Sequence, residues 1–156
     1  MEELKVMAYH GTGVRFNEFE CKAYFSEYRE TAVFFAKRCV GVPCVYSCFL
    51  VFNNPLIVYL GGQSWGGIFL SDDKIQEECI QYATCGDLEE VEYYKEEGIT
   101  INILGEYAEE KGYDGVIAYD CYEEDGSRGI QYVVLSPKQI EIVCVETLEK
   151  AVSDGG

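Results

Sequence analysis

The amino-acid sequence predicts one α+β domain built on a split, mostly antiparallel sheet. The chain has 156 residues, of which 48% are hydrophobic, and this size and composition suit a single domain with its own core. Its predicted strands precede and follow a helical middle without the regular strand–helix alternation of a parallel sheet. We expect the domain to occupy residues 1–150 and residues 151–156 to form a disordered tail.

Strands dominate the first third of the chain. The expected strands are 5–10, 22–26, 42–52 and 56–60. The glycine-rich turn 11–13 follows the first strand, and a loop over 14–21 leads to the second. Between the second and third strands, apolar residues at helical spacing predict a helix over 29–40 that ends before Gly41.

The middle of the chain is acidic and helical. Three helices are expected: one from a Ser71 cap to about Cys85, one over 88–96, and one from a Thr100 cap to Gly112. Asp87 with Glu90 three residues later forms a capping-box pattern for the second of these helices. The remaining expected elements are strands at 115–119, 130–135 and 140–145, with an acidic loop between the first two.

Acidic residues dominate the charge of the chain. Asp and Glu number 28 against 12 Lys and Arg, which gives a formal net charge of −16. We expect no nucleic-acid partner, because its phosphates would be repelled at long range. The charge suits a protein partner with a basic surface, or simply a well-solvated surface.

Cysteine usage and the start of the chain indicate a reducing compartment. The chain has 8 cysteines and one histidine, and no cysteine pair has the C-x-x-C spacing of a metal or redox motif, so we expect no metal site. The first residues lack the pattern of a signal peptide, and no apolar run reaches the ~18 residues of a membrane span. We therefore expect a cytoplasmic protein with no membrane association.

Three segments carry side chains that can line one cleft. His10 ends the first predicted strand before Gly11, where its ring and free backbone N–H groups can face a ligand; the plainer interpretation is a ring satisfied by a nearby carbonyl. Tyr24 and Phe34 can form two walls of a slot for a flat cationic ring such as the nicotinamide of NAD, or can belong to the core. Gln131 begins the apolar face of a later strand, as a cleft residue or as a strand-edge glutamine bonded to water.

Three motifs follow one another along the chain. They are Tyr9-His10-Gly11-Thr12; Ala23-Tyr24-Phe25-Ser26 with Thr31-Ala32-Val33-Phe34; and Gln131-Tyr132-Val133-Val134 followed by Gln139-Ile140. Together they resemble the ADP-ribosyltransferase superfamily of the diphtheria-toxin and poly(ADP-ribose) polymerase type, in its His-Tyr-Glu class. Asn53-Asn54-Pro55-Leu56 and Gly112-Tyr113-Asp114-Gly115-Val116-Ile117 are similar to segments of small bacterial and phage members. The resemblance spans residues 8–143 and implies that family's split sheet and a toxin- or effector-like enzyme.

The resemblance implies NAD as the substrate and gives the first motif a binding role. His10 would hydrogen-bond a ribose hydroxyl of NAD, and Gly11 would offer its backbone N–H and C=O to the carboxamide. Thr12 belongs to the same NAD-binding strand end. The hydroxyl of Thr31, on the following helix, would bind the same carboxamide.

By the same resemblance, Tyr24 and Phe34 would sandwich the nicotinamide ring. The spacing between them is one residue shorter than in the polymerases, so Phe35 remains a fallback for the second wall. Helical periodicity disfavours this fallback, because it places Phe35 on one stripe with Ala32 and Ala36.

Gln131 stands where the family usually has its catalytic glutamate, beside His10 and Tyr24 in the expected catalytic set. Cleaving the nicotinamide–ribose bond creates an oxocarbenium-like ribose, and a carboxylate there can accept a charge-assisted hydrogen bond from the 2′-hydroxyl and help to deprotonate the acceptor. The Gln131 amide can hold the hydroxyl but carries no charge. The nearby acidic run 123–125, Glu123-Glu124-Asp125, can supply a carboxylate, although such runs usually face water.

The predicted function is that of an NAD-dependent mono-ADP-ribosyltransferase. It would transfer ADP-ribose to a macromolecular target, most simply a protein with a basic surface, and release nicotinamide. The alternative is a catalytically silent member of the fold that binds NAD or a protein and acts as an acidic inhibitor or decoy. A third interpretation is an NAD glycohydrolase, with water as the acceptor.

Overall fold

A seven-stranded sheet forms the frame of the structure, a computed structural model that describes residues 3–149. The strand order is β4-β5-β6-β2-β1-β3-β7, and every neighbouring pair is antiparallel except β4 with β5. The strands are β1 (Leu4–Thr12), β2 (Ala23–Ser26), β3 (Cys44–Phe52), β4 (Pro55–Tyr59), β5 (Gly115–Tyr122), β6 (Arg128–Val134) and β7 (Ile140–Thr147). The predicted α+β class with a mostly antiparallel sheet is confirmed. The tail predicted at 151–156 lies outside the described residues.

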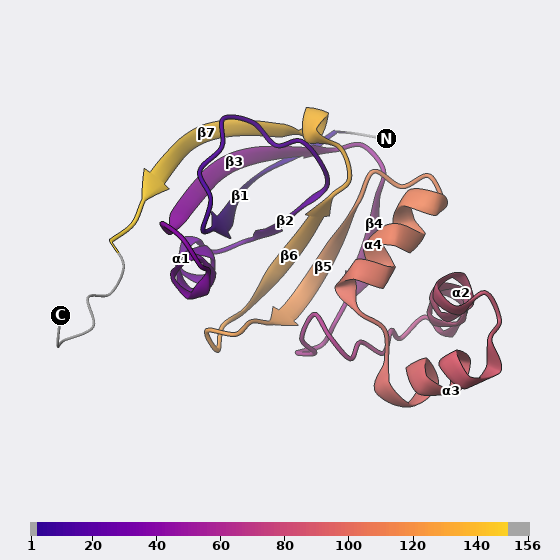
Figure 1. Cartoon of the computed structure of the whole chain (residues 1–156). Coiled ribbons are helices and arrows are strands. Elements are labelled where there is room, and N and C mark those ends of the chain that lie inside the picture. Colours follow the sequence, from indigo (N-terminus) through magenta and orange to yellow (C-terminus); the bar gives the residue numbers. More distant parts are fainter. Residues whose placement is uncertain (1–2, 150–156) are drawn as a thin grey trace, which may run out of the picture.

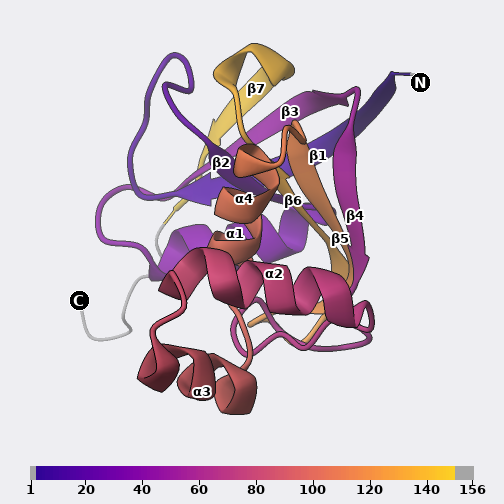
Figure 2. The same cartoon turned by 90° about the vertical axis from the view of Figure 1, so that its right-hand side faces the viewer.

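The helices cover the two ends of the sheet separately (Figure 1). They are α1 (Arg29–Arg38), α2 (Asp73–Thr84), α3 (Leu88–Glu97) and α4 (Ile101–Glu110), with a short 3₁₀ helix, η1 (Pro137–Gln139). Helix α1 packs against β1 and β3, whereas α4 packs against β5. Helix α2 packs against α4, and α3 packs against α2 at the edge of the molecule (Figure 2). Helix α1 therefore lies over the β1–β3 end of the sheet and α4 over the β5 end, with β2 and β6 between them.

Two apolar clusters lie on opposite faces of the central strands. Val133 of β6 belongs to the cluster under α2 and α4, whereas its neighbours Tyr132 and Val134 belong to the cluster that β1, β2 and β3 share. Successive residues of a strand point to opposite faces, and both faces of β6 are buried here. This double burial fixes the register of β6 and therefore the face on which Gln131 lies.

Of all neighbouring strands in the sheet, β1 and β2 share the fewest paired residues. Strand β1 pairs with β3 along its whole length, and β2 pairs with β6 over all four of its residues. Between β1 and β2, however, only Tyr9 and Ser26 are in register. The strands do not divide into two sheets, as the predicted split implied, but form one hydrogen-bonded sheet. Its two parts meet at a seam, where a single residue pair joins β1 to β2.

Two predicted boundaries are wrong because paired strands run further than expected. Gly11 and Thr12 were predicted to lie in a turn, but both continue β1 because β3 supplies their partners. The acidic loop was predicted to extend to Gly129, yet β5 continues to Tyr122 and β6 starts at Arg128. The loop is thus a short turn over residues 123–127 at the end of a β-hairpin.

The helix caps largely follow the sequence. Side-chain oxygens of Asp87 and Thr100 accept hydrogen bonds from backbone N–H groups in the first turns of α3 and α4, as predicted. Helix α2 is capped by Asp72, one residue after the predicted Ser71, and the Asp72 carboxylate accepts two backbone N–H groups. A carboxylate is the stronger acceptor at a helix N-terminus, where the helix dipole favours negative charge.

Candidate functional site

A cleft of about 550 Å³ lies at the seam between β1 and β2. Residues from β1, β2, β6, α1 and the first turn of α4 line it, and they include His10, Tyr24 and Gln131 from three different strands. Small-molecule sites usually measure about 300–1,000 Å³ and have largely apolar walls. The cleft therefore has the size and position of a ligand site, and the three residues of the predicted catalytic set meet in it.

His10 ties the two sides of the seam together. Its Nδ1 atom lies 2.7 Å from the backbone carbonyl oxygen of Tyr24, and a carbonyl can only accept, so Nδ1 carries the proton. Burial lowers the pKa of His10, which keeps the ring neutral near pH 7. Nδ1 is thus satisfied by a carbonyl, as the plainer interpretation of the sequence held. In this tautomer Nε2 is an acceptor, and His10 lines the cleft.

Gly11 allows α1 to approach β1 closely. A Cβ atom at this position would lie 2.1 Å from the carbonyl oxygen of Ala32, so no other residue fits without displacing the helix. Thr31 also lines the cleft, but its hydroxyl is engaged by the β5–β6 turn, where it donates to Asp125 Oδ2 at 3.1 Å. Thr12 is not among the lining residues; its hydroxyl accepts the backbone N–H of Val14.

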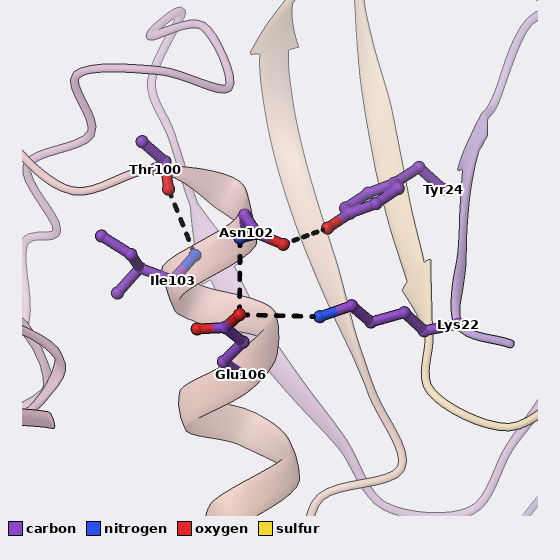
Figure 3. Close-up of polar contacts among 6 residues, drawn as sticks. All are labelled: Lys22, Tyr24, Thr100, Asn102, Ile103 and Glu106. Carbon is purple, nitrogen blue, oxygen red and sulfur yellow. Dashed lines mark hydrogen bonds and ion pairs between the residues drawn. The ribbon is translucent and has the colours of Figure 1, made fainter. Parts of the chain in front are cut away.

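Tyr24 is fixed from the far side of the cleft by α4. Its hydroxyl donates to Asn102 Oδ1 at 2.8 Å (Figure 3). The Asn102 amide reaches Glu106 Oε1 at 3.5 Å, and Lys22 pairs with the same oxygen at 3.9 Å. Burial, and then the charge of Glu106, raise the pKa of Tyr24 above its ordinary value. The ring is therefore held by a polar network that joins β2 to α4.

The first turn of α4 is shaped to face the cleft. Thr100 caps the helix by accepting the N–H of Ile103 at 3.2 Å (Figure 3), and Thr100, Ile101 and Asn102 all line the cleft. The N–H of Ile101 donates to the backbone carbonyl of Trp65 at 2.8 Å. That contact brings the 61–67 loop to the same wall.

Trp65 is a cleft residue that the sequence reasoning missed. It is the only tryptophan of the chain, lies in a glycine-rich loop, and is 46% exposed while lining the cleft. A lone aromatic residue among glycines, outside any predicted element, was the available signal. The cleft therefore has, next to the first turn of α4, an aromatic residue that the three motifs do not contain.

Both candidate aromatic residues on α1 line the cleft. Phe34 is 38% exposed and Phe35 is 53% exposed, whereas Ala32 and Ala36 are buried. The expectation that Phe35 shares the buried stripe of the alanines is therefore wrong, because the helix packs on its small residues and leaves both phenylalanines at the surface. Arg38 lies over the Phe34 ring at 5.5 Å and fixes that wall.

The acidic turn does not simply face water. Glu123 is 7% exposed, and its Oε1 atom has no hydrogen-bond partner among the described residues. Burial, followed by the charge of Asp125, raises the pKa of Glu123 from its ordinary 4.5 to about 7. Glu124 pairs with Arg38 at 2.5 Å. The prediction that this run is solvated is wrong for Glu123, because the β-hairpin extends far enough to turn its side chain against the protein.

Asp125 is held differently from its neighbour Glu123. It accepts the Ser127 hydroxyl at 2.6 Å and the Ser127 backbone N–H at 3.0 Å, in addition to Thr31. Burial alone would raise the pKa of Asp125, but these hydrogen bonds outweigh it and leave the pKa below its ordinary value. Two carboxyl groups of one turn are therefore tuned in opposite directions.

Comparison with known proteins does not place the chain in a family. The chain matches no protein-family model, no curated protein and no solved structure. Within residues 3–149, no three His, Cys, Asp or Glu side chains are grouped to hold a metal ion, and none of the helices there has the length and apolarity to cross a membrane. The fold and site define an α+β protein with an aromatic, acidic cleft at a seam of its sheet.

Proposed function

We propose that the chain is an NAD-dependent mono-ADP-ribosyltransferase, and that the cleft is its NAD site. The observation that carries this proposal is the convergence of His10, Tyr24 and Gln131 on one cleft from three strands distant in sequence. These are the three positions that the sequence resemblance places in the catalytic set. Aromatic side chains on α1 and in the 61–67 loop complete walls that suit a flat cationic ring.

Each protein group would have a defined task in this reaction. The Nε2 atom of His10 would accept a ribose hydroxyl, since Nδ1 is already occupied by Tyr24. Tyr24 would stack on the nicotinamide ring, in an orientation set by Asn102. The first turn of α4 also lines the cleft, and the positive end of its helix dipole suits the diphosphate of a dinucleotide. It would do so through its charge, since its Ile101 and Ile103 N–H groups are already bonded to Trp65 and Thr100.

The reaction would proceed through positioning and electrostatics. The C–N bond between ribose and nicotinamide would break with its electron pair moving to the ring nitrogen, which leaves as neutral nicotinamide. Positive charge would develop on the ribose, as in glycoside hydrolysis, and Gln131 would hold the 2′-hydroxyl. The acceptor atom of a protein target would then bond to the ribose carbon and release its proton to water, because the Gln131 amide cannot take it. We further propose a cytoplasmic location. The target would present a basic surface, which complements a chain of net charge −16.

A silent, NAD-binding member of this fold is the second candidate. Gln131 favours it, since an amide neither stabilises the cationic ribose by charge nor takes a proton. Labelled NAD distinguishes the candidates when it is incubated with the protein alone and with a cell lysate. Nicotinamide release with a labelled macromolecule supports the transferase, and release without any label indicates a glycohydrolase. NAD binding by calorimetry without release above background indicates the silent protein, and absence of both excludes the NAD site.

A further inference from the structure

The buried carboxyl group of Glu123 has no role in the reaction described above. Glu123 lines the cleft, is 7% exposed, and keeps Oε1 buried without a hydrogen-bond partner among the described residues. An ionised carboxylate enclosed in this way is costly unless a positive charge lies near it. Among the described residues that line the cleft, none is a lysine or an arginine. When Glu123 is ionised, its counter-charge therefore has to come from outside the cleft walls.

The two neighbouring carboxylates of the turn are already satisfied. Arg38 neutralises Glu124 at 2.5 Å, and Asp125 accepts hydrogen bonds from Ser127 and Thr31. Neither group compensates Glu123, because both are themselves negative and raise its pKa further. Of the three carboxyl groups of the turn, only Glu123 has a buried oxygen without a hydrogen-bond partner among the described residues.

Strand geometry places Glu123 on the same face as Gln131. Residues 131, 129 and 127 of the β6 side alternate onto one face. The backbone N–H of Glu123 donates to the carbonyl of Ser127 at 2.9 Å, and Cys121 pairs with Gly129. Cross-strand partners share a face, so Glu123 faces the cleft from the end of the hairpin, opposite Ser127 and thus four residues along the β6 side from Gln131.

The aromatic walls favour the same kind of ligand as the unpaired carboxylate. Tyr24, Phe34, Phe35 and Trp65 all line the cleft, and the faces of such rings attract cations. A neutral ring could stack on these walls, but it would leave Glu123 uncompensated. A flat ring that carries a positive charge satisfies both features at once.

We propose that Glu123 makes the cleft selective for a cationic aromatic ring, which binds with this carboxylate ionised. This inference rests on the proposed function, in which the ring is the pyridinium of NAD, and it adds the residue that distinguishes the charged ring from a neutral one. The carboxylate acts through its charge in a poorly hydrated site, where electrostatic attraction is stronger than in water. It is a specificity-determining residue and takes no part in bond cleavage.

The affinity for the cationic ring should increase with pH. Burial raises the pKa of Glu123 to about 7, Asp125 and Glu124 add to the shift, and the Cys121 thiol opposes it. From β1, His10 also lines the cleft, and burial keeps its ring neutral near pH 7. Only ionised Glu123 attracts the ring, so affinity for a cation rises as the pH increases through about 7. A neutral ring lacks this dependence.

The test compares two probes that differ in one charge: nicotinamide, which is neutral, and 1-methylnicotinamide, which is a permanent cation. Their affinities are measured by calorimetry at pH 6 and pH 8 on the full chain and on Glu123→Gln, Glu123→Asp and Glu96→Gln. Glu96 is an exposed acid on α3 and serves as the matched control. Thermal melting of each variant shows that it is folded.

We expect the unaltered protein to prefer the cation by about tenfold or more at pH 8. This preference should fall by about tenfold at pH 6, where only a minor fraction of Glu123 is ionised. Glu123→Gln should lose most of the cation preference and its dependence on pH, leaving only what the aromatic walls and Asp125 contribute. Glu123→Asp should keep a pH-dependent preference, and Glu96→Gln should behave as the unaltered protein does.

Two results would overturn the inference: equal affinities in the unaltered protein at pH 8, or an unchanged preference in Glu123→Gln. Either can occur while nicotinamide is still released from NAD, so the proposed function would survive it. Conversely, a cation preference that depends on Glu123 in a protein that neither binds nor cleaves NAD supports the cation site and rejects the proposed function.

Discussion

The Nδ1 atom of His10 lies 2.7 Å from the carbonyl oxygen of Tyr24, across the seam where only one residue pair joins β1 to β2. A side chain therefore makes the connection that the backbone ladder lacks at this point. Because the bond is made to the backbone of Tyr24, it does not depend on the Tyr24 ring. The same imidazole links the stability of the seam to the shape of the cleft.

Two replacements of His10 separate these two roles. His10→Ala leaves the Tyr24 carbonyl without its partner and should lower the free energy of unfolding by about 1–3 kcal/mol. His10→Asn can still donate from a position close to Nδ1, so it should retain most of the stability, but it lacks the Nε2 acceptor. We expect both variants to lose NAD affinity in calorimetry and only His10→Ala to unfold at a clearly lower denaturant concentration. Equal stability of the two variants would contradict the role of the seam bond.

Tyr24 offers a second matched pair. Tyr24→Phe removes the hydrogen bond to Asn102 and should cost about 1 kcal/mol of stability while keeping the ring for stacking. Tyr24→Ala removes the ring itself and should weaken NAD binding by about 1 kcal/mol or more. Calorimetry with both variants checks the slot: if Tyr24→Ala binds NAD as well as Tyr24→Phe does, this ring does not contact the nicotinamide.

Glu123 should make the stability of the protein depend on pH. Its pKa is about 7 in the folded state against an ordinary 4.5, so between these values the folded protein holds a proton that the unfolded chain has lost. Stability contributed by this group is therefore full below about pH 4.5 and falls as the pH rises to about 7, by about 3 kcal/mol in total. Glu123→Gln should remove this decline, so that it unfolds at higher denaturant concentration than the unaltered protein at pH 8. If the free energy of unfolding changed with pH in the same way in both proteins, the pKa of Glu123 would not be raised by folding.

Local sequence rules predicted the parts of the fold that depend on local interactions. The caps at Asp87 and Thr100 were predicted because one side chain and the following N–H groups determine them. The ends of β1 and the β5–β6 hairpin were not, because Gly11 is made a strand residue by its partner Val45 on β3, far along the chain. Propensity around the glycine indicated only a turn.

The site shows the same division. The motifs around His10, Tyr24 and Gln131 were visible in the sequence and lie in one cleft. Trp65 and Glu123 were not assigned to the site. The position of Trp65 depends on a loop fixed by α4, and the burial of Glu123 depends on how far the β5–β6 hairpin extends. Charge runs are usually solvated, and only the tertiary structure distinguishes Glu123 from the paired Glu124 beside it.

Gln131→Glu tests whether the cleft is arranged for chemistry. Gln131 pairs with Ser26 and Ala118 in the middle of the sheet and lines the cleft, so a side chain of nearly the same shape should fit without rearrangement. The change adds a negative charge and a proton acceptor where the resemblance expects a carboxylate. We expect NAD affinity to stay within a few-fold and nicotinamide release to rise by about 10²-fold, if general-base assistance alone is gained.

The control for this prediction is the double variant with His10→Ala. If His10 holds the ribose, the gain from Gln131→Glu should disappear in the double variant, since the new carboxylate would no longer meet a fixed 2′-hydroxyl. No increase in release from Gln131→Glu with any lysate would show that the cleft binds without reacting, and the silent protein would then be the correct interpretation. Release that is already as fast with Gln131 would mean that another group supplies the carboxylate. Glu123, which faces the same cleft, would then be the first residue to replace, with Glu124 the next.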